Sequence, residues 1–353
     1  YLADKVFDGK VGINNKNIAF DFKGKLDFHE EIPNTNFTLN LKNAQLGALH
    51  LNPISQDESA TISFKLQSNL NGGNIDDATG KVTITDLKYS NSKGKIATKT
   101  IDISSSFSNN LHTLQFQSEF ADAKLVGDFK ISELNELPSK LLSKYINVGT
   151  LRKTDSLHNE SGNLTVNFKN TAPILSLLKS GYYISKNAKL AAKYNLSGDE
   201  KLQLSFDAED LQLADYSLHN VKLRSKGTDR LSTELDIARL NFTDEYSLIH
   251  LAVENDIQDN RMRTFIDFGN KESLNYAGQI SAISIFQEEE NQQFSVKNTL
   301  SPTKIYLNDQ TWQVSEAEIL MDTASIAFDK LSISNEKSHI KVDGIWSNNK
   351  EDA

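Results

Sequence analysis

Apolar residues alternate with polar residues along most of the chain, which is the pattern of a β-strand with one dry and one solvated face. The first clear run places Ile18, Phe20 and Phe22 at every second position. Runs of the same kind recur as far as Ile340 and Val342. Clusters of Gly, Asn and Ser, such as residues 71–73 and 197–199, separate the runs as turns do. The pattern predicts strands across nearly the whole chain.

Helical spacing is confined to two short stretches. Leucines at three- and four-residue intervals, with a proline suited to a first helical position, predict a helix over Pro138–Ile146. A second short helix is predicted to start at Pro173. We interpret the first helix as a cap on an exposed sheet edge, and a gate or plug is the alternative.

This scarcity of helix determines the predicted fold class. Purely parallel sheets need helices on both faces, so we expect an all-β fold with a long, mainly antiparallel, repetitive sheet. The dry faces could pack as sandwiches, close into a barrel or line an open trough, and periodicity does not choose among these. We predict a β-segment over 1–146 that ends in the short helix, an irregular connection over 147–160 that lacks alternation, and a continuation of the sheet over 161–353.

Composition narrows the classes of function. The net charge is −9 and Lys and Arg are scattered singly, so we expect no nucleic-acid partner. The absence of Cys excludes disulfides, thiolate metal sites and thiol nucleophiles. The sequence has no apolar run of ~18 residues, the length that a membrane-spanning helix needs. Because the chain starts without Met and stops in a polar stretch, we expect it to be an internal segment of a longer protein.

Candidate catalytic chemistry is weak. The seven histidines are dispersed, and the Gly-Lys dipeptides do not complete a phosphate-binding loop. Asp207, Glu209 and Asp210 could bind calcium or act as an acid/base pair, but we favour a polar strand end. We therefore predict no catalytic residues, no metal site and no cofactor, and a protein that is not an enzyme.

Several strings carry a resemblance to a known family. In the first half they are Asn69–Asp77, Gly80–Ile84, Leu87–Tyr89 and Ser118–Phe129. Near the C-terminus they are Asn308–Val314, Ile319–Asp322, Ile326–Asp329 and Leu331–Asn335. These strings resemble passages of the TamB/AsmA-like proteins, in the form found in Bacteroidota, and the leucine helix follows in the corresponding place.

The resemblance implies a periplasmic segment of a long protein that is tethered to the inner membrane by a region outside this chain. It implies a repeating sheet bent into an open apolar groove (a "β-taco") that conducts phospholipids between the inner and outer membranes. A barrel protein of the TamA/BamA type in the outer membrane is the implied partner, again through regions outside the segment. Two alternatives stay open: an assembly factor that templates strands of outer-membrane barrels, and a structural or adhesive array of β-sandwiches.

The candidate lipid-binding residues are the inward members of the alternating runs. For each of them an ordinary packed core position is the alternative. They are Ile18, Phe20, Phe22, Phe37, Leu39, Ile62, Phe64, Leu66, Leu114, Phe116, Leu164, Val166, Phe168, Leu202, Leu204 and Phe206.

Overall fold

The computed structural model describes residues 2–29, 34–51, 59–148, 160–178, 181–243, 246–270, 273–288 and 294–347. Strands make up 71% of the chain and helices 4%. The predicted all-β class, the long and mainly antiparallel sheet and the two short helices are therefore confirmed.

The chain forms two compact units. The N-terminal unit comprises Tyr1–Leu134 and Ser161–Ala191, and the C-terminal unit comprises Asn135–Glu160 and Ala192–Ala353. Strand β12 (Lys189–Asn195) runs across this division. Most of the connection predicted over 147–160, namely residues 149–159, lies outside the described residues.

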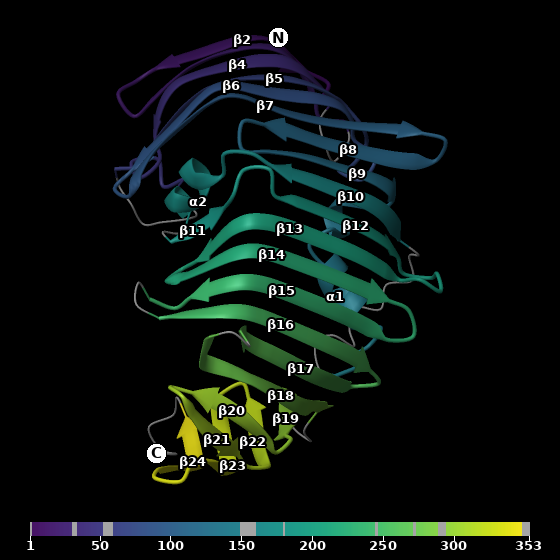
Figure 1. The fold of residues 1–353 in the computed structure, drawn as a ribbon. Coiled ribbons are helices and arrows are strands. Elements are labelled where there is room, and N and C mark those ends of the chain that lie inside the picture. Colours follow the sequence, from purple (N-terminus) through teal and green to yellow (C-terminus); the bar gives the residue numbers. More distant parts are fainter. Residues whose placement is uncertain are drawn as a thin grey trace. The chain divides into compact units, whose positions relative to one another are not determined.

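The N-terminal unit is an antiparallel meander. Each strand from β1 to β8 pairs with the strand that follows it, and β9 pairs with β10. Figure 1 shows β2 to β7 side by side in purple and blue. Its elements are β1 (Leu2–Ala3), β2 (Val6–Asn14), β3 (Ile18–Asp27), β4 (Asn34–Gln45), β5 (Thr61–Asn71), β6 (Thr79–Asn91), β7 (Gly94–Ser108), β8 (Leu111–Ser118), β9 (Ala121–Asp128), the 3-10 helix η1 (Ile131–Glu133), β10 (Ser161–Phe168), α2 (Ala172–Leu178) and β11 (Tyr182–Ile184).

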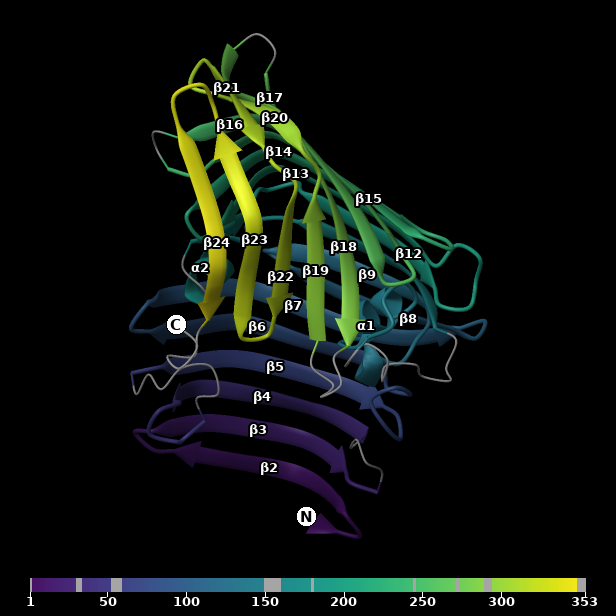
Figure 2. The ribbon, with the colours of Figure 1, turned by 90° about the horizontal axis from the view of Figure 1, so that it is seen from below.

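The C-terminal unit continues the same pairing scheme from β13 to β19 and then branches. Strand β18 also pairs with β20, β19 pairs with β22, and β23 pairs with β21, β22 and β24. Figure 2 shows β19, β22, β23 and β24 side by side. Its elements are α1 (Leu137–Leu142), β13 (Leu202–Leu213), β14 (Tyr216–Gly227), β15 (Leu231–Asn241), β16 (Ser247–Gln258), β17 (Arg261–Asn270), β18 (Ser273–Glu288), β19 (Phe294–Leu300), β20 (Thr303–Leu307), β21 (Gln310–Val314), β22 (Ala317–Asp322), β23 (Ser325–Ser334) and β24 (His339–Ser347).

Three of the hairpins are tight turns that contain no glycine. The two-residue turns Asn109–Asn110, Asp259–Asn260 and Asn308–Asp309 have positive φ at both central positions. That is the type I′ turn, whose twist matches the flanking strands and which Asn and Asp tolerate better than other residues with a Cβ. The Asn and Asp content of the chain thus serves the meander directly.

Some strands carry a residue of positive φ within their length, and this changes the phase of their alternation. Asp86 in β6, Asn220 in β14 and His250 in β16 have φ values of 54°, 52° and 58°. In β14, Leu218 and Val221 are both buried although they lie three residues apart. Figure 1 shows β13 to β16 arched along their length. A strict two-residue period therefore fails at these positions.

The helices agree with the predictions in place but not in length. Helix α1 ends at Leu142, short of the predicted Ile146, because the chain tightens into a bond from the N–H of Tyr145 to the carbonyl of Leu142, 2.9 Å long. Helix α2 begins at Ala172, one residue before the predicted start at Pro173.

Candidate functional site

The predicted lining residues of the N-terminal unit share one face of its sheet. Residues directly opposite each other in antiparallel strands point to the same side. Phe22 lies opposite Leu39, which lies opposite Leu66. The same face carries every candidate in β3, β4, β5, β8 and β10. We call it the N-terminal apolar face, formed by Phe7, Val11, Ile13, Ile18, Phe20, Phe22, Leu26, Phe37, Leu39, Leu41, Ile62, Phe64, Leu66, Val82, Ile84, Ile101, Ile103, Leu114, Phe116, Leu164, Val166 and Phe168.

These side chains are only partly shielded from solvent. Every lining candidate of the N-terminal unit is half-buried. Val11 and Ile13 in β2 are 41% and 43% exposed. Ring contacts run across the strands, with centroids 5.6 Å apart between Phe7 and Phe22 and 5.0 Å between Phe22 and Phe37. Ile101 of this face is buried, and most of the other members are partly exposed, so the face is an apolar surface that solvent partly reaches.

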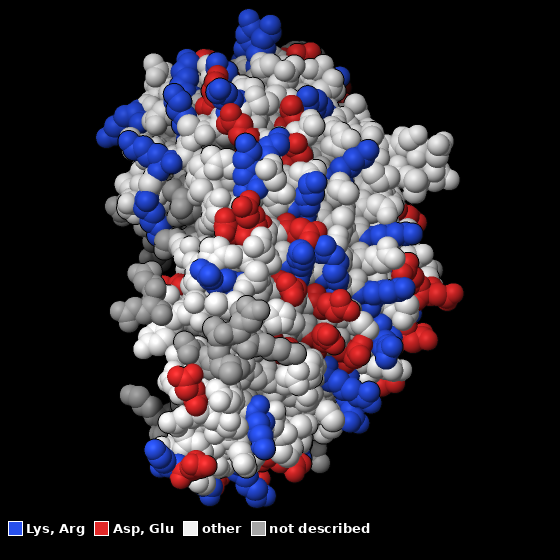
Figure 3. Space-filling model, viewed as in Figure 1, with Lys and Arg blue, Asp and Glu red and all other residues white. Residues whose placement is uncertain are grey.

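The opposite side of the same strands is charged. Lys65 in β5 lies 2.9 Å from Asp86, and Lys81 in β6 lies 3.0 Å from Asp102. Figure 3 shows basic and acidic side chains interspersed over the view that corresponds to Figure 1. Exposed pairs of this kind add little stability, ~0–1 kcal/mol each. The charged side chains keep one side of the sheet solvated, and the other side is the apolar face.

The C-terminal unit also has an apolar face, but it is more deeply buried, with Ala208, Val221 and Ile237 only 6%, 3% and 2% exposed. Leu202, Leu204 and Phe206 lie on one face of β13, where Leu202 is buried and the other two are half-buried. None of the residues on that face is charged. We call it the C-terminal apolar face, formed by Leu202, Leu204, Phe206, Ala208, Val221, Leu223, Leu231, Leu235, Ile237, Leu251, Val253, Ile257, Met262, Ile266, Phe268 and Ile280.

A row of uncharged polar residues crosses the C-terminal apolar face, and the sequence reasoning missed it. We call it the polar row: Ser225, Thr233, Asn255 and Thr264, one from each of β14, β15, β16 and β17. Each is half-buried. The signal was present in the sequence as one polar residue within the apolar phase of each strand, for example at Thr233, two positions before Leu235. Within its own strand each of these polar residues is a single exception to the apolar pattern, and only the strand register shows that the four are aligned.

Tyr145 covers one end of this face. Its side chain is 3% exposed, and a Cβ added to Gly227 would lie 2.2 Å from the hydroxyl oxygen. Gly227 is the cross-strand partner of Leu202, so the phenol lies on the apolar face and not at a sheet edge. Burial raises the pKa of Tyr145 to about 12. The residues just after α1 therefore pack onto the C-terminal apolar face, whereas we interpreted the helix from the sequence as a cap on a sheet edge.

A buried histidine is a second feature that the sequence did not single out. The ring of His112 in β8 is stacked between Phe107 and Phe129, at centroid distances of 4.2 Å and 4.7 Å. Its Nε2 lies 2.7 Å from the hydroxyl of Ser105, which donates to the carbonyl of Ala78. Which atom donates in the bond between Nε2 and Ser105 depends on the tautomer of the ring.

We expect His112 to make the stability of the N-terminal unit depend on pH. Burial lowers the pKa of His112 below its usual 6.5, although the Phe129 backbone opposes the shift. The unfolded chain therefore binds a proton first, and stability falls as pH drops through about 6.5 and is constant above it. Chemical unfolding at a series of pH values should show this slope, and His112→Gln should abolish it. His339→Gln, at an exposed position, should leave it intact; an unchanged slope in His112→Gln would contradict the assignment.

The carboxylate cluster of the sequence analysis is not at a strand end, so that interpretation is wrong. Asp207, Glu209 and Asp210 lie within β13, which runs on to Leu213. Asp207 lies 2.6 Å from Arg224, and Asp210 lies 2.6 Å from His219. The apolar pattern of β13 changes phase at this point, which is why the acidic residues looked like an end.

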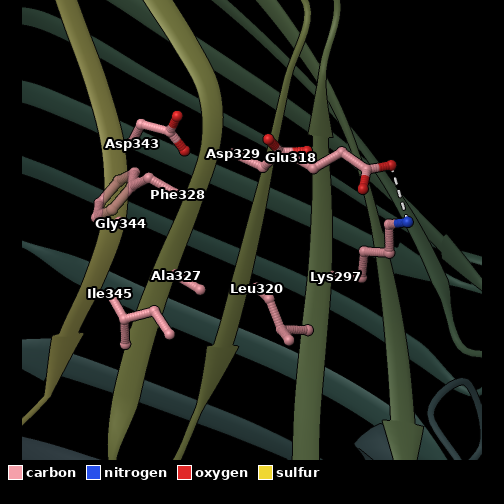
Figure 4. Close-up of a pocket in the computed structure, with 9 residues that line it drawn as sticks. All are labelled: Lys297, Glu318, Leu320, Ala327, Phe328, Asp329, Asp343, Gly344 and Ile345. Carbon is pink, nitrogen blue, oxygen red and sulfur yellow. Dashed lines mark ion pairs between the residues drawn. The ribbon is translucent and has the colours of Figure 1, made fainter. Parts of the chain in front are cut away.

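A hollow of about 380 Å³ lies on the last strands of the C-terminal unit. Figure 4 shows Glu318, Asp329 and Asp343 around it, with Lys297 joined to Glu318 at 2.8 Å. Asp329 and Asp343 lie 3.4 Å and 3.5 Å from lysines at 330 and 341. Each carboxylate thus has a lysine beside it, and the hollow is a solvated surface feature.

Within the described ranges, no group of three or more His, Asp or Glu side chains is placed to hold a metal ion. The same part of the chain contains no helix that is long and apolar enough to cross a membrane.

We compared the chain with known protein families, curated proteins and solved structures. No protein-family model, curated protein or solved structure matches the chain.

Proposed function

We propose that this chain is a segment of a lipid-conducting bridge, and that phospholipid acyl chains travel over its two apolar faces. One observation carries the proposal: the N-terminal apolar face is uncharged and most of its side chains are half-buried or exposed, while the opposite side of the same strands is charged. Contiguous apolar surface left in contact with water marks a site of interaction with lipid, ligand or protein.

The direction of the rows suits transport. Cross-strand partners align perpendicular to the strands, so an acyl chain moving from one strand to the next meets a similar apolar row every ~4.8 Å. An acyl chain that left such a surface for water would raise its free energy by about 0.8 kcal/mol per methylene. Sliding between near-equivalent rows avoids that cost, and headgroups can stay in solvent. No single residue is essential to this mechanism; unbroken apolar character is.

The resemblance to TamB/AsmA-like proteins supplies the rest of the proposal. It supports a periplasmic location, an inner-membrane tether outside this segment and an outer-membrane barrel partner of the TamA/BamA type. A stacked sandwich array fits less well, because its inward residues would be dry, and the lining candidates of β4 and β5, which have strands on both sides, are half-buried.

A charge placed on the apolar face should stop lipid binding without unfolding the protein. In Phe64→Asp the half-exposed site lets the carboxylate reach water, so we expect a cooperative melt within a few degrees of wild type. Co-purifying phospholipid, measured by mass spectrometry of organic extracts, should fall severalfold. Gln67→Asp, on the solvated side of the same strand, should keep both the melt and the lipid.

Two outcomes of this experiment would contradict the proposal. Global unfolding of Phe64→Asp would identify the face as a closed core. Unchanged lipid content in a folded Phe64→Asp protein would remove the face from any lipid path.

The second candidate function, templating of barrel strands, is favoured by β24. Among the described strands β24 pairs with β23 alone, and a strand edge of this kind can accept a further strand, whether from the continuation of a longer chain or from a partner. Its apolar side chains are exposed, with Ile345 at 62% and Trp346 at 59%. If Phe64→Asp folds and keeps its lipid, strand templating would be favoured over lipid conduction by the N-terminal apolar face.

A further inference from the structure

The polar row of the C-terminal unit is a hydrogen-bonding track within an apolar surface. The hydroxyls of Ser225 and Thr233 lie 2.8 Å apart, and Thr264 donates to the amide oxygen of Asn255 at 2.7 Å. The register places all these side chains directly across from one another on successive strands. The track thus runs in the same direction as the apolar row of Phe206 and Leu223 beside it.

Tyr145 is an independent sign of a missing acceptor at the end of this track. Its hydroxyl is buried on the apolar face over Gly227, two residues along β14 from Ser225. Among the described residues the hydroxyl has no hydrogen-bond partner. A buried hydroxyl without an acceptor is costly, so an acceptor brought by a ligand would be favoured there.

The chemistry of that acceptor follows from what the face lacks. The polar row and its apolar neighbours contain no Lys, Arg, Asp or Glu, so the face itself offers no charge to pair with a phosphate or an amine; the carboxylate of Asp229 acts on Tyr145 from outside the face. The donors are hydroxyls, which can rotate toward a new acceptor, and the amide of Asn255. A neutral carbonyl attached directly to an apolar chain matches both the row and the surface beside it.

We propose that the polar row and Tyr145 bind the ester carbonyls of glycerolipids, while the acyl chains lie over the neighbouring apolar rows. This inference rests on the proposed function and adds to it which part of the lipid the protein recognises, namely the ester group. It sets the depth of the lipid: the ester region tracks along Ser225, Thr233, Asn255 and Thr264, and the headgroup lies beyond the face.

The test compares lipids that differ only in the carbonyl. Protein of the full sequence is incubated with vesicles of dioleoyl phosphatidylcholine or of its dialkyl ether analogue, and protein-bound lipid is quantified by mass spectrometry. With one to two net hydrogen bonds at stake, we expect the ester lipid to load about fivefold to tenfold more than the ether lipid. This comparison needs no substitution and cannot fail through misfolding.

Isosteric variants then locate the effect. Thr233→Val combined with Thr264→Val should reduce the ester-to-ether ratio toward one while ether loading stays at the wild-type level, and Tyr145→Phe should reduce it in part. Ser232→Ala, on the opposite side of β15, should keep the ratio.

An equal loading of both lipids by wild type would overturn this inference alone, as would a ratio that survives in the double variant. Loading of neither lipid would overturn the proposed function, and this inference with it.

Discussion

Glu160→Gln is expected to cost the C-terminal unit about 3–5 kcal/mol, the usual penalty for breaking a buried ion pair. The Nζ of Lys140 lies 3.0 Å from Oε1 of Glu160, and the two side chains are 1% and 0% exposed. Glutamine keeps the shape but removes the charge, and the ammonium of Lys140 then stays buried beside a neutral amide. Against a typical total stability of ~5–15 kcal/mol, such a loss is large.

Denaturant unfolding followed by tryptophan fluorescence measures this loss in the right place, because both tryptophans, Trp312 and Trp346, belong to the C-terminal unit. Lys140→Met should be as damaging as Glu160→Gln. The double variant Lys140→Met/Glu160→Leu should recover most of the stability, since an apolar pair avoids desolvating two charges.

The control is the exposed pair of Lys297 and Glu318, whose side chains are 40% and 48% exposed. Glu318→Gln should change the free energy of unfolding by less than about 1 kcal/mol. Equal effects of Glu160→Gln and Glu318→Gln would show that burial does not govern the Lys140 pair.

Gly127→Ala is expected to destabilise the N-terminal unit by about 3 kcal/mol, at the upper end for overpacking. A Cβ on Gly127 would lie 2.0 Å from the carbonyl oxygen of Ser161 and 2.5 Å from the Cα of Gly162. Both are backbone atoms, so no side chain can rotate away, and β9 and β10 must separate. Amide hydrogen exchange in these two strands should accelerate, and the melting temperature should fall.

Gly12→Ala in β2 is the matched control. Its Cβ would meet only the carboxylate of Asp21 at 3.4 Å and the carbonyl of Phe20 at 3.8 Å, which are ordinary contacts. We expect no loss there. A Gly127→Ala protein as stable as Gly12→Ala would mean that the close approach of β9 and β10 is not a constraint.

The fold class and the apolar face could be predicted from sequence because both depend on a local rule. Alternation at Ile18, Phe20 and Phe22 identifies a strand and its dry side at once, whatever the strand pairs with. The register then joined these local choices into one face. The rule failed where the backbone broke it, as at Asn220 and His250, whose positive φ shifts the phase by one residue.

The remaining features depend on contacts between residues that are distant in sequence. Lys140 reads as a solvated helical residue until Glu160 lies beside it. His112 gives no sign of burial, because the ring of Phe129, 17 residues away, covers it from the side opposite its hairpin partner Phe107. The polar row needs the pairing of four strands before it is a row at all. Periodicity within one strand carries none of this information.

The pairing of each strand with its neighbour in sequence has a consequence for how the protein assembles. Strands β1 to β9 each pair with their neighbours in sequence. Contacts between residues close in sequence therefore offset most of the entropy cost of ordering the chain, and the relative contact order is low for a β protein. The thermodynamics then approach those of a one-dimensional array, in which stability is a sum of strand and nearest-neighbour terms. Such an array can lengthen or shorten by whole hairpins, because each added hairpin contacts only its neighbours.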